Sequence, residues 1–476
     1  MKREEKKLVK NTLLLMLGNF SSKLLVFLMV PLYTSVLTTA EYATSDLLTT
    51  TINLLYPFAT LMISTAVMRF CLDKCKDSRQ LLSIGIWIEF IGIAFVALGS
   101  MLFFNSGNLQ GYRYYFLIGF AGYSLYTLLM EYAKGSEKVG MYSIAGVCNT
   151  VALISCNIVF LLKLGLGIKG YLMAMIAAYW ITIVVLFIGC RAWKDLLWPN
   201  QIERGYVKEM LQYSIPLMPN SISWWVSNSS DRYIMNIFRG LSELGIYSVS
   251  YKIPSIMATI SGIMVSAWEM SAVDDFGSEK SRRFFSQIYD MWVHTYLIVC
   301  TGLVLGVKIL ALILFQKDFF SAWRFVPILL YASIFSGLSS FLGTVFTAAK
   351  KTKAVFVTTM VGAGINIVLN FALIPLWGGY GAAIATAVGY LATFFSRLKG
   401  ANSIMHLDVD YKKHFFRLGV LLLMVVVSCA DSWINYAIGF LVLLMERDFI
   451  ADVIKKVMRR FYKKGIDNMR KKEELS

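Results

Sequence analysis

Charged side chains are scarce in this sequence, and long polar stretches between its apolar runs are absent. Asp, Glu, Lys and Arg make up 16% of the 476 residues, against roughly a quarter in a typical soluble domain. Apolar residues make up 57%, and the mean hydropathy is +0.62. This composition excludes an ordinary water-soluble domain, because the chain has too few polar side chains to cover a soluble surface.

Residues that carry metal, redox or phosphate chemistry are few, and their spacing forms no known motif. The three histidines lack the spacing of metal ligands, the seven cysteines lack paired spacing, and no glycine-rich phosphate-binding pattern occurs. Asp408 and Asp410 are the one echo of a nucleotide-sugar metal motif, and in a short loop we interpret them as solvated charge. We therefore expect no disulfide, no metal, no cofactor and no enzymatic activity, and no ATP-driven pump.

Apolar runs recur from Leu8 to Met445, and each is long enough to cross a hydrocarbon core of about 30 Å as a helix. The predicted fold class is an all-α membrane protein with about fourteen transmembrane helices. The predicted spans are 8–35, 42–68, 81–103, 113–133, 142–163, 168–189, 211–238, 243–269, 284–314, 322–347, 354–375, 378–396, 412–430 and 433–446. The last span is short, so a chain of thirteen spans with an interfacial final segment is the alternative.

Positive charges are distributed unevenly between alternate loops. The net charge is +17, and with the N-terminus inside, 36 Lys and Arg fall in cytoplasmic segments against seven in outer loops. This bias follows the positive-inside rule and predicts that both termini are cytoplasmic. Because membrane orientation accounts for the basic residues, the charge requires no nucleic-acid partner.

Two pairs of similar segments indicate an internal repeat. AEYATSDLL from Ala40 resembles SELGIYSVS from Ser242, and GLGIKGYLMA from Gly165 resembles LWGGYGAAIA from Leu376. Transporter folds are often built from repeated halves, and chance similarity between small-residue helices is the alternative. The predicted organisation is an N-terminal six-helix lobe (1–190), a cytoplasmic linker (191–210), a C-terminal six-helix lobe (211–400), two additional helices (401–446) and a basic amphipathic cytoplasmic tail (447–476).

Three basic residues, Lys23, Arg232 and Lys252, lie inside predicted spans one, seven and eight. A cation at the centre of a lone helix costs about 2.5–3.5 kcal/mol, so each should face a protein interior or a wet cavity. A cationic cavity suits an anionic ligand, and Asn19 and Asn228 are polar companions on the same spans. We predict that these five residues bind the substrate.

Three acids lie at comparable depths: Asp46 in span two, Glu89 in span three and Asp231 beside Arg232. They are candidates for a proton or cation site, or for acids that line the cavity. Asp231 and Arg232 point about 100° apart on a helix, so they need different partners. The alternative for all of these charges is a set of buried ion pairs that orient the helices, for example Lys23 with Asp46.

Three segments carry a resemblance to a known family: DRYIMNIFRGLSELGIYSVSYKI (231–253), MRFCLDKCKD (68–77) and NIVLNFALIPLWGGYGAAIAT (366–386). They are similar to segments of the polysaccharide-unit flippases, the Wzx-type branch of the multidrug/oligosaccharidyl-lipid/polysaccharide exporter superfamily. The resemblance covers essentially the whole chain. It implies two six-helix lobes in a V around a cationic cavity, two added helices after span twelve, and a place in the bacterial cytoplasmic (inner) membrane.

The resemblance also implies a function, which is translocation of undecaprenyl-diphosphate-linked oligosaccharide to the outer leaflet for a surface glycan such as O-antigen or capsule. Related lipid II flippases carry basic residues in the first and eighth spans and an acid in the second, and Lys23, Lys252 and Asp46 fall on similar positions. A proton or sodium gradient, or consumption of the product outside, would supply direction. The partners would be the lipid-linked glycan, membrane lipid, a glycan polymerase and glycosyltransferases.

Other functions stay open on the residues alone. A multidrug or cation antiporter of the same superfamily would favour acids over cations in the cavity, whereas basic residues are at least as prominent here. A polytopic glycan polymerase would need a large extracytoplasmic loop, and the predicted outer loops are all short. A purely structural scaffold would not require three cations in the middle of the membrane.

Overall fold

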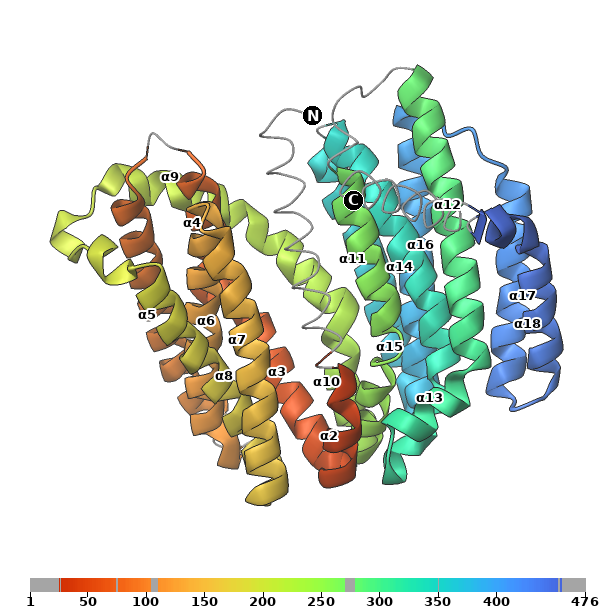
Figure 1. Cartoon of the computed structure of the whole chain (residues 1–476), viewed down its shortest axis with the longest axis horizontal. Helices are drawn as coiled ribbons and strands as arrows, with labels where there is room; N and C mark the ends of the chain where they lie inside the picture. Colours follow the sequence, from red (N-terminus) through yellow and green to blue (C-terminus); the bar gives the residue numbers. More distant parts are fainter. Residues whose placement is uncertain are drawn as a thin grey trace, which may run out of the picture. The chain divides into compact units, whose positions relative to one another are not determined.

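The structure is a computed structural model, and it describes residues 25, 27–73, 76–103, 110–269, 279–349, 351–452 and 454–455. Every regular element within these residues is helical (Figure 1), which confirms the predicted all-α class. The chain divides into two compact units. The first comprises Met1–Lys252, Ala311–Ala322 and Phe356–Ala392, and the second comprises Ile253–Leu310, Trp323–Val355 and Thr393–Ser476.

Seven of the described helices are long and apolar enough to cross a membrane, and the bent pair α3 and α4 makes an eighth candidate. The seven are built from α5 (Ser78–Phe103), α7 with η2 (Val139–Asn157 and Ile158–Lys163), α8 (Gly167–Gly189), α12 (Glu279–Leu305), α14 (Val326–Ala348), α15 (Thr352–Trp377) and α16 (Gly379–Ile404). Other predicted spans coincide with helices that are shorter or richer in charge and tyrosine: α6 (Arg113–Gly135), α10 (Met218–Ser250), α11 (Ser255–Glu269), α17 (Tyr411–Cys429) and α18 (Ile434–Met445). More than half of the first predicted span lies outside the described residues, so the count of fourteen stays a prediction.

In the first unit, α2 (Val30–Val36) leads into the bent pair α3 (Thr39–Thr60) and α4 (Ile63–Cys71). The two helices meet at 64° because Leu61 and Met62 both adopt left-handed backbone angles. Helix α6 packs against α4, α5 and α8, and α7 packs against α8. The apolar core beneath them includes Val67 and Leu128, both fully buried. The bend therefore divides one predicted span, 42–68, into two helical segments.

The segment between α8 and α10 packs against α5 through side-chain hydrogen bonds. It contains η3 (Ala192–Asp195), η4 (Pro199–Gln201), α9 (Arg204–Ser214) and η5 (Ile215–Leu217). Ser83 of α5 donates to the Asp195 carbonyl at 3.1 Å and accepts from the Leu197 amide at 2.8 Å. Gln80 of α5 bonds backbone groups of Gln201 and Glu203 at 3.0 and 3.1 Å. These side-chain bonds satisfy backbone groups that the irregular linker leaves without helical partners.

Helix α10 is two helices joined at Gly240, which has φ +80° and ψ 176°. A residue with a side chain rarely adopts this conformation, so glycine permits the reversal here. The second helix of this pair ends at Ser250, and a short turn leads into α11. Predicted span seven thus ends just before Gly240, and predicted span eight begins just after it. Residues that are equally far from Gly240 in sequence therefore lie at similar distances from the hairpin turn, one on each helix.

The predicted internal repeat has a geometric counterpart at the starts of α8 and α16. Gly167 and Gly378 both have positive φ, +54° and +53°. Glu41 lies beside Gly167, since a Cβ there would come within 3.3 Å of its Oε1, and Glu243 accepts from the Gly379 amide at 2.9 Å. The pairs Glu41 with Glu243 and Gly167 with Gly378 are separated in sequence by about the offsets of the two similar segments. Glu41 beside Gly167 and Glu243 beside Gly378 each place a carboxylate at a helix N-terminus, where it is stabilised by the helix dipole.

We predict that Gly378→Ala destabilises the protein more than Gly165→Ala. Both glycines have positive φ, so both substitutions incur roughly 1–2 kcal/mol of backbone strain. A Cβ at Gly378 would also overlap the Glu243 carboxylate, whereas nothing lies within 4 Å of one at Gly165. Thermal unfolding of the purified variants should show the larger drop in Tm for Gly378→Ala. Equal drops would mean that the Glu243 contact adds nothing.

The second unit contains α11, α12, α14, α17, α18, the first half of α13 (Val307–Leu314) and the end of η6 (Lys317–Arg324). Helix α14 packs against α11, α12 and α17, and α17 pairs with α18 as a hairpin. Predicted span nine, 284–314, is broken at Gly306 into α12 and α13. At one end, buried Glu446 pairs with Arg417 at 3.3 Å and with His294, so α12, α17 and α18 share one ionic cluster.

Candidate functional site

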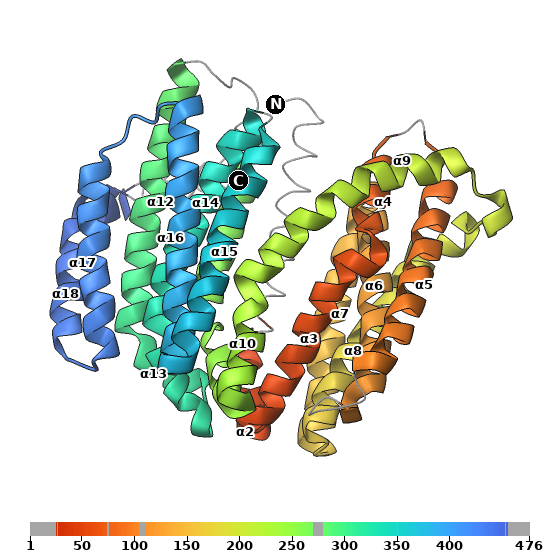
Figure 2. The ribbon, with the colours of Figure 1, turned by 180° about the vertical axis from the view of Figure 1, so that it is seen from behind.

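The candidate site lies in the first unit, where α3 and α10 pack side by side (Figure 2). Arg232 precedes Gly240 by eight residues and Ser248 follows it by eight. At about 1.5 Å per residue, both lie roughly 12 Å from the hairpin turn. This depth lies well inside a hydrocarbon core of about 30 Å if the turn is at its edge. Polar side chains from α3 and both parts of α10 therefore meet within the span.

Arg232 and Asp46 form the centre of this network. Arg232 Nε donates to Asp46 Oδ2 at 2.6 Å, and Ser248 Oγ donates to the same oxygen at 2.7 Å. Arg232 Nη1 also donates to the Asn228 carbonyl at 2.7 Å. The side chains of Arg232 and Asp46 are 12% and 25% exposed, so the pair is reachable from outside the protein interior. A reachable ion pair can exchange partners in a way that a sealed one cannot.

Asp231, the neighbour of Arg232, has a different set of partners. Its Oδ2 accepts hydrogen bonds from Tyr247 at 2.7 Å and Tyr251 at 2.9 Å, and the two hydroxyls are 2.9 Å apart. Asp231 is 3% exposed, and its Oδ1 is 3.9 Å from Arg232 Nη1. The Arg232 guanidinium also lies over the Tyr251 ring, 5.1 Å from its centre. The helical spacing predicts this divergence of partners for Asp231 and Arg232, because adjacent side chains do not face one way.

Two further predicted residues lie near this network. Asn228, one turn before Arg232, accepts from the Tyr390 hydroxyl at 2.5 Å and donates to the Trp224 carbonyl at 2.6 Å. Lys252 follows the end of α10, where its backbone amide donates to Val249 at 3.0 Å. Its side chain is half-buried and interacts electrostatically with Tyr171. Tyr171 also interacts electrostatically with Asp46.

Glu89 belongs to a separate place in the same unit. It lies on α5, is fully buried, and accepts a hydrogen bond from Ser124 of α6. Tyr56 and Tyr123 lie close enough to interact with its charge. Among the described residues its Oε1 has no hydrogen-bond partner. A buried acid with one open acceptor is suited to holding a proton or a cation, but it does not join the Asp46 and Arg232 network.

Lys23 and Asn19 lie outside the described residues. The example of an ion pair drawn from the sequence, Lys23 with Asp46, is therefore untested. The structure gives Asp46 another partner, Arg232.

The sequence predictions missed the hydroxyl groups of the site. Tyr247, Ser248 and Tyr251 complete the hydrogen bonding of the two aspartates. The signal was present in the run YSVSY (247–251), because Tyr247 and Tyr251 are four residues apart and therefore share one face of a helix, with Ser248 next to Tyr247. It could be used only once the reversal at Gly240 was known, because Tyr247 lies sixteen residues from Asp231.

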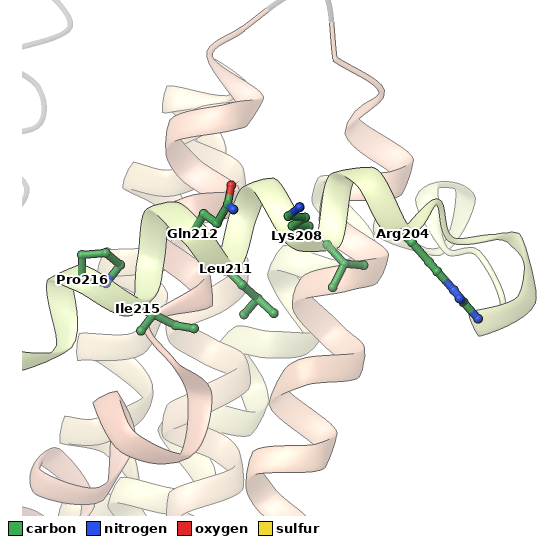
Figure 3. Close-up of a pocket in the computed structure, with 7 residues that line it drawn as sticks. Arg204, Lys208, Leu211, Gln212, Ile215 and Pro216 are labelled. Atoms are coloured by element: carbon green, nitrogen blue, oxygen red, sulfur yellow. The ribbon is translucent and has the colours of Figure 1, made fainter.

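A groove along α9, with a volume of about 660 Å³, lies elsewhere in the first unit (Figure 3). It is open and follows one stripe of the helix, from Arg204 and Lys208 to Leu211 and Ile215. None of its lining residues belongs to the charged network.

This helical architecture, with long apolar helices and charged residues inside predicted spans, defines the chain as a multi-pass membrane protein. The chain belongs to the family of polysaccharide biosynthesis proteins, whose sequence model matches residues 8–268. This match confirms the resemblance to the polysaccharide-unit flippases found in the sequence. No curated protein matches the sequence significantly.

Solved structures with a similar fold include three transporters. One is the lipid II flippase MurJ in an inward closed conformation, with a TM-score of 0.69 and 14% identity over 92% of this chain and 99% of that chain. Another is an inward-facing multidrug resistance MATE family transporter of the MOP superfamily, with a TM-score of 0.63 and 12% identity over 80% and 95% of the two chains. A third is the Vibrio cholerae MATE transporter VcmN in the bent form, with a TM-score of 0.52 and 14% identity over 85% and 98%. At these identities the similarity shows the fold.

Proposed function

We propose that this protein is a flippase that moves undecaprenyl-diphosphate-linked oligosaccharide from the inner to the outer leaflet of the bacterial cytoplasmic membrane. The observation that carries the proposal is the reachable Arg232 and Asp46 pair, deep in a predicted span of a polysaccharide biosynthesis protein. A lipid diphosphate cannot cross hydrocarbon unaided, because its charge would lose its hydration. A shielded path with fixed positive charge offsets that loss.

Arg232 is the proposed recognition group for the diphosphate. A guanidinium can bind phosphate oxygens through paired N–H donors, and Arg232 now donates one of its N–H groups, at Nε, to the Asp46 carboxylate. The incoming diphosphate would replace Asp46 as the partner of Arg232. Asp46, released from its counter-charge, is the first acid proposed for a proton or sodium site that couples transport to an ion gradient. Asp231 and Glu89 are the other acids proposed for a proton or sodium site.

Lys23 and Lys252 complete the proposed binding site as a clamp on the same diphosphate, with Asn19 and Asn228 as polar companions. No bond of the substrate is broken, so the protein acts as a transporter and not as an enzyme. The proposed moving parts are the two six-helix lobes, 1–190 and 211–400, joined by the linker at 191–210 and accompanied by the helices of 401–446 and the tail at 447–476. Membrane lipid, a glycan polymerase and glycosyltransferases are the proposed partners.

A cation or drug antiporter is the second candidate function. The buried Glu89 with its open acceptor favours it, because such antiporters need an acid that binds and releases cations. Gene deletion separates the two functions. The flippase predicts loss of surface glycan such as O-antigen or capsule, accumulation of the lipid-linked precursor, and unchanged resistance to cationic drugs. Increased drug sensitivity with normal surface glycan would establish the antiporter instead.

We predict that the linker and the C-terminus face the cytoplasm, because of the charge bias of 36 to seven. In a variant without native cysteines, Trp198→Cys and Asp448→Cys should react with an impermeant maleimide only after the cells are opened. Asp318→Cys, in a predicted outer loop, is the matched control and should react in intact cells. All three positions are exposed. Labelling of Trp198→Cys from outside would overturn the orientation.

A further inference from the structure

A small cavity with both polar and apolar walls lies in the second unit, and it shares no residue with the charged network. Its volume is about 160 Å³, which corresponds to about five water molecules at roughly 30 Å³ each. Lys308 of α13 and Trp323 of η6 line it. Its lining also includes Asp431 and Trp433, from the turn between α17 and α18, and Asn435 of α18. A space of this size fits one sugar ring and is too small for a lipid chain.

Asn435 has unmet hydrogen-bonding capacity at this cavity. The residue is 8% exposed, and its Oδ1 has no hydrogen-bond partner among the described residues. Buried side-chain carbonyl groups are nearly always hydrogen-bonded, so Asn435 would gain a hydrogen bond by turning its amide toward a donor in the cavity that it lines. A ligand hydroxyl is such a donor, and the amide can also donate to a second hydroxyl.

The cavity also offers charged groups of both signs. Lys308 pairs with Asp431, and the Lys308 Nζ lies 4.9 Å from the centre of the Trp323 ring. The pair cancels its own net charge, so the cavity selects neither an anion nor a cation. Among the described residues no group of three or more metal-ligating side chains occurs. An ammonium and a carboxylate that are already paired can still exchange hydrogen bonds with neutral hydroxyl groups.

Exposed aromatic rings complete the site. Trp433 is 76% exposed and Tyr436 is 53% exposed, and both line the cavity. An aromatic face packs well against the apolar C–H face of a pyranose ring, while the ring's hydroxyls bind the amide and acid. The aromatic rings, the Asn435 amide and the ion pair with no net charge therefore suit a neutral sugar.

We propose that this cavity binds a single neutral sugar residue of the transported glycan at the outer face of the membrane, an inference that rests on the proposed function. The predicted topology places the turn between α17 and α18, and the loop after α13, on the outer side. A sugar held there would keep the emerging glycan on the side where it is released.

The test is saturation-transfer NMR on the full chain in amphipol, since sugar-based detergents would compete. The probes are glucose, galactose and N-acetylglucosamine. Wild type should transfer saturation to at least one of them, and Trp433→Leu and Asn435→Leu should each lower that signal at least fivefold. Trp198→Leu removes a similarly exposed tryptophan from the linker and should leave the signal unchanged. Absence of a signal with wild type, or a full signal with both cavity variants, would overturn the proposal.

A leaflet-accessibility assay with lipid-linked oligosaccharide, run on the same preparations, separates this proposal from the proposed function. If wild type bound a probe sugar through Trp433 and Asn435 but did not move the lipid, the flippase proposal would fail and the sugar site would stand. If wild type moved the lipid and the cavity variants kept the full sugar signal, only the sugar site would fail.

Discussion

Arg232→Gln is expected to abolish glycan export. The substitution removes the proposed phosphate donor and leaves Asp46 and Asp231 without a cation in an apolar span. A hydrogen bond to a charged group contributes about 1.5–3 kcal/mol, so its loss should weaken substrate binding roughly 10- to 150-fold. Surface glycan, measured in a strain that lacks the chromosomal copy and with expression matched, should fall to the level of the empty vector.

The same substitution also threatens folding, so a second variant separates the two effects. Loss of one partner from a buried ion pair costs about 3–5 kcal/mol, and the lower end is expected because Asp46 is a quarter exposed. The double variant Asp46→Asn with Arg232→Gln removes both charges and should regain most of the thermal stability. Its export should stay lost, because the cation is still missing.

Arg283→Gln is the matched control for this experiment. Arg283 forms an ion pair with Glu279 in which both side chains are about 70% exposed, and such surface pairs contribute little. Export and Tm should both stay near wild type. If the Asp46 and Arg232 double variant exported as well as this control, the pair would be a structural device that orients α3 and α10, and Arg232 would have no role in substrate binding.

Lys252→Gln and Lys23→Gln should each reduce export about tenfold or more, because a dianionic head group can bridge two separated cations and each should supply roughly 1.5–3 kcal/mol. Lys252 lies at the end of α10, just beyond the Tyr247 and Tyr251 hydroxyls that hold Asp231. Arginine at either position should retain much of the export, since a point charge is what lysine supplies.

The control for the lysine series is Lys412→Gln, on an exposed position at the start of α17. It changes the net charge by the same amount and should export normally. Export is measured as for the Arg232 variants, as surface glycan in a strain that lacks the chromosomal copy, with expression of the variants matched. Normal export by either Lys23→Gln or Lys252→Gln would show that the charge at that position is dispensable, and the clamp would be wrong.

Much of the fold could be predicted because a membrane imposes a simple rule on sequence: a spanning helix must be long and apolar. That rule locates α5, α8, α14 and α15 closely. It gives no information on breaks inside an apolar run, so the bend at Leu61 and Met62 was not predicted. Nor was α9 resolved as a helix, because its polar surface resembles that of a linker.

The charged residues of the site could be picked out for the same reason, since a charge in a span must have a partner or a function. Their pairing could not be predicted, because Asp46 and Arg232 are 186 residues apart. Many other partners could equally offset the cost of placing either charge in a span. Arg232 had an equally plausible neighbour in Asp231, and helix geometry excluded only direct facing. The role of the tyrosine hydroxyls could not be predicted, because tyrosine is common near membrane interfaces and the reversal at Gly240 that brings Tyr247 and Tyr251 to Asp231 was not known.

The central claim is that this chain moves a lipid diphosphate glycan across a bilayer by means of Arg232. It is tested most directly in liposomes that contain the purified protein and lipid-linked oligosaccharide on both leaflets, with an impermeant glycan-cleaving enzyme added outside. Wild type should bring nearly all of the glycan to the enzyme, while liposomes with Arg232→Gln should lose only the outer-leaflet share. If wild type also lost only the outer-leaflet share, with the protein shown to be folded, the account would be contradicted.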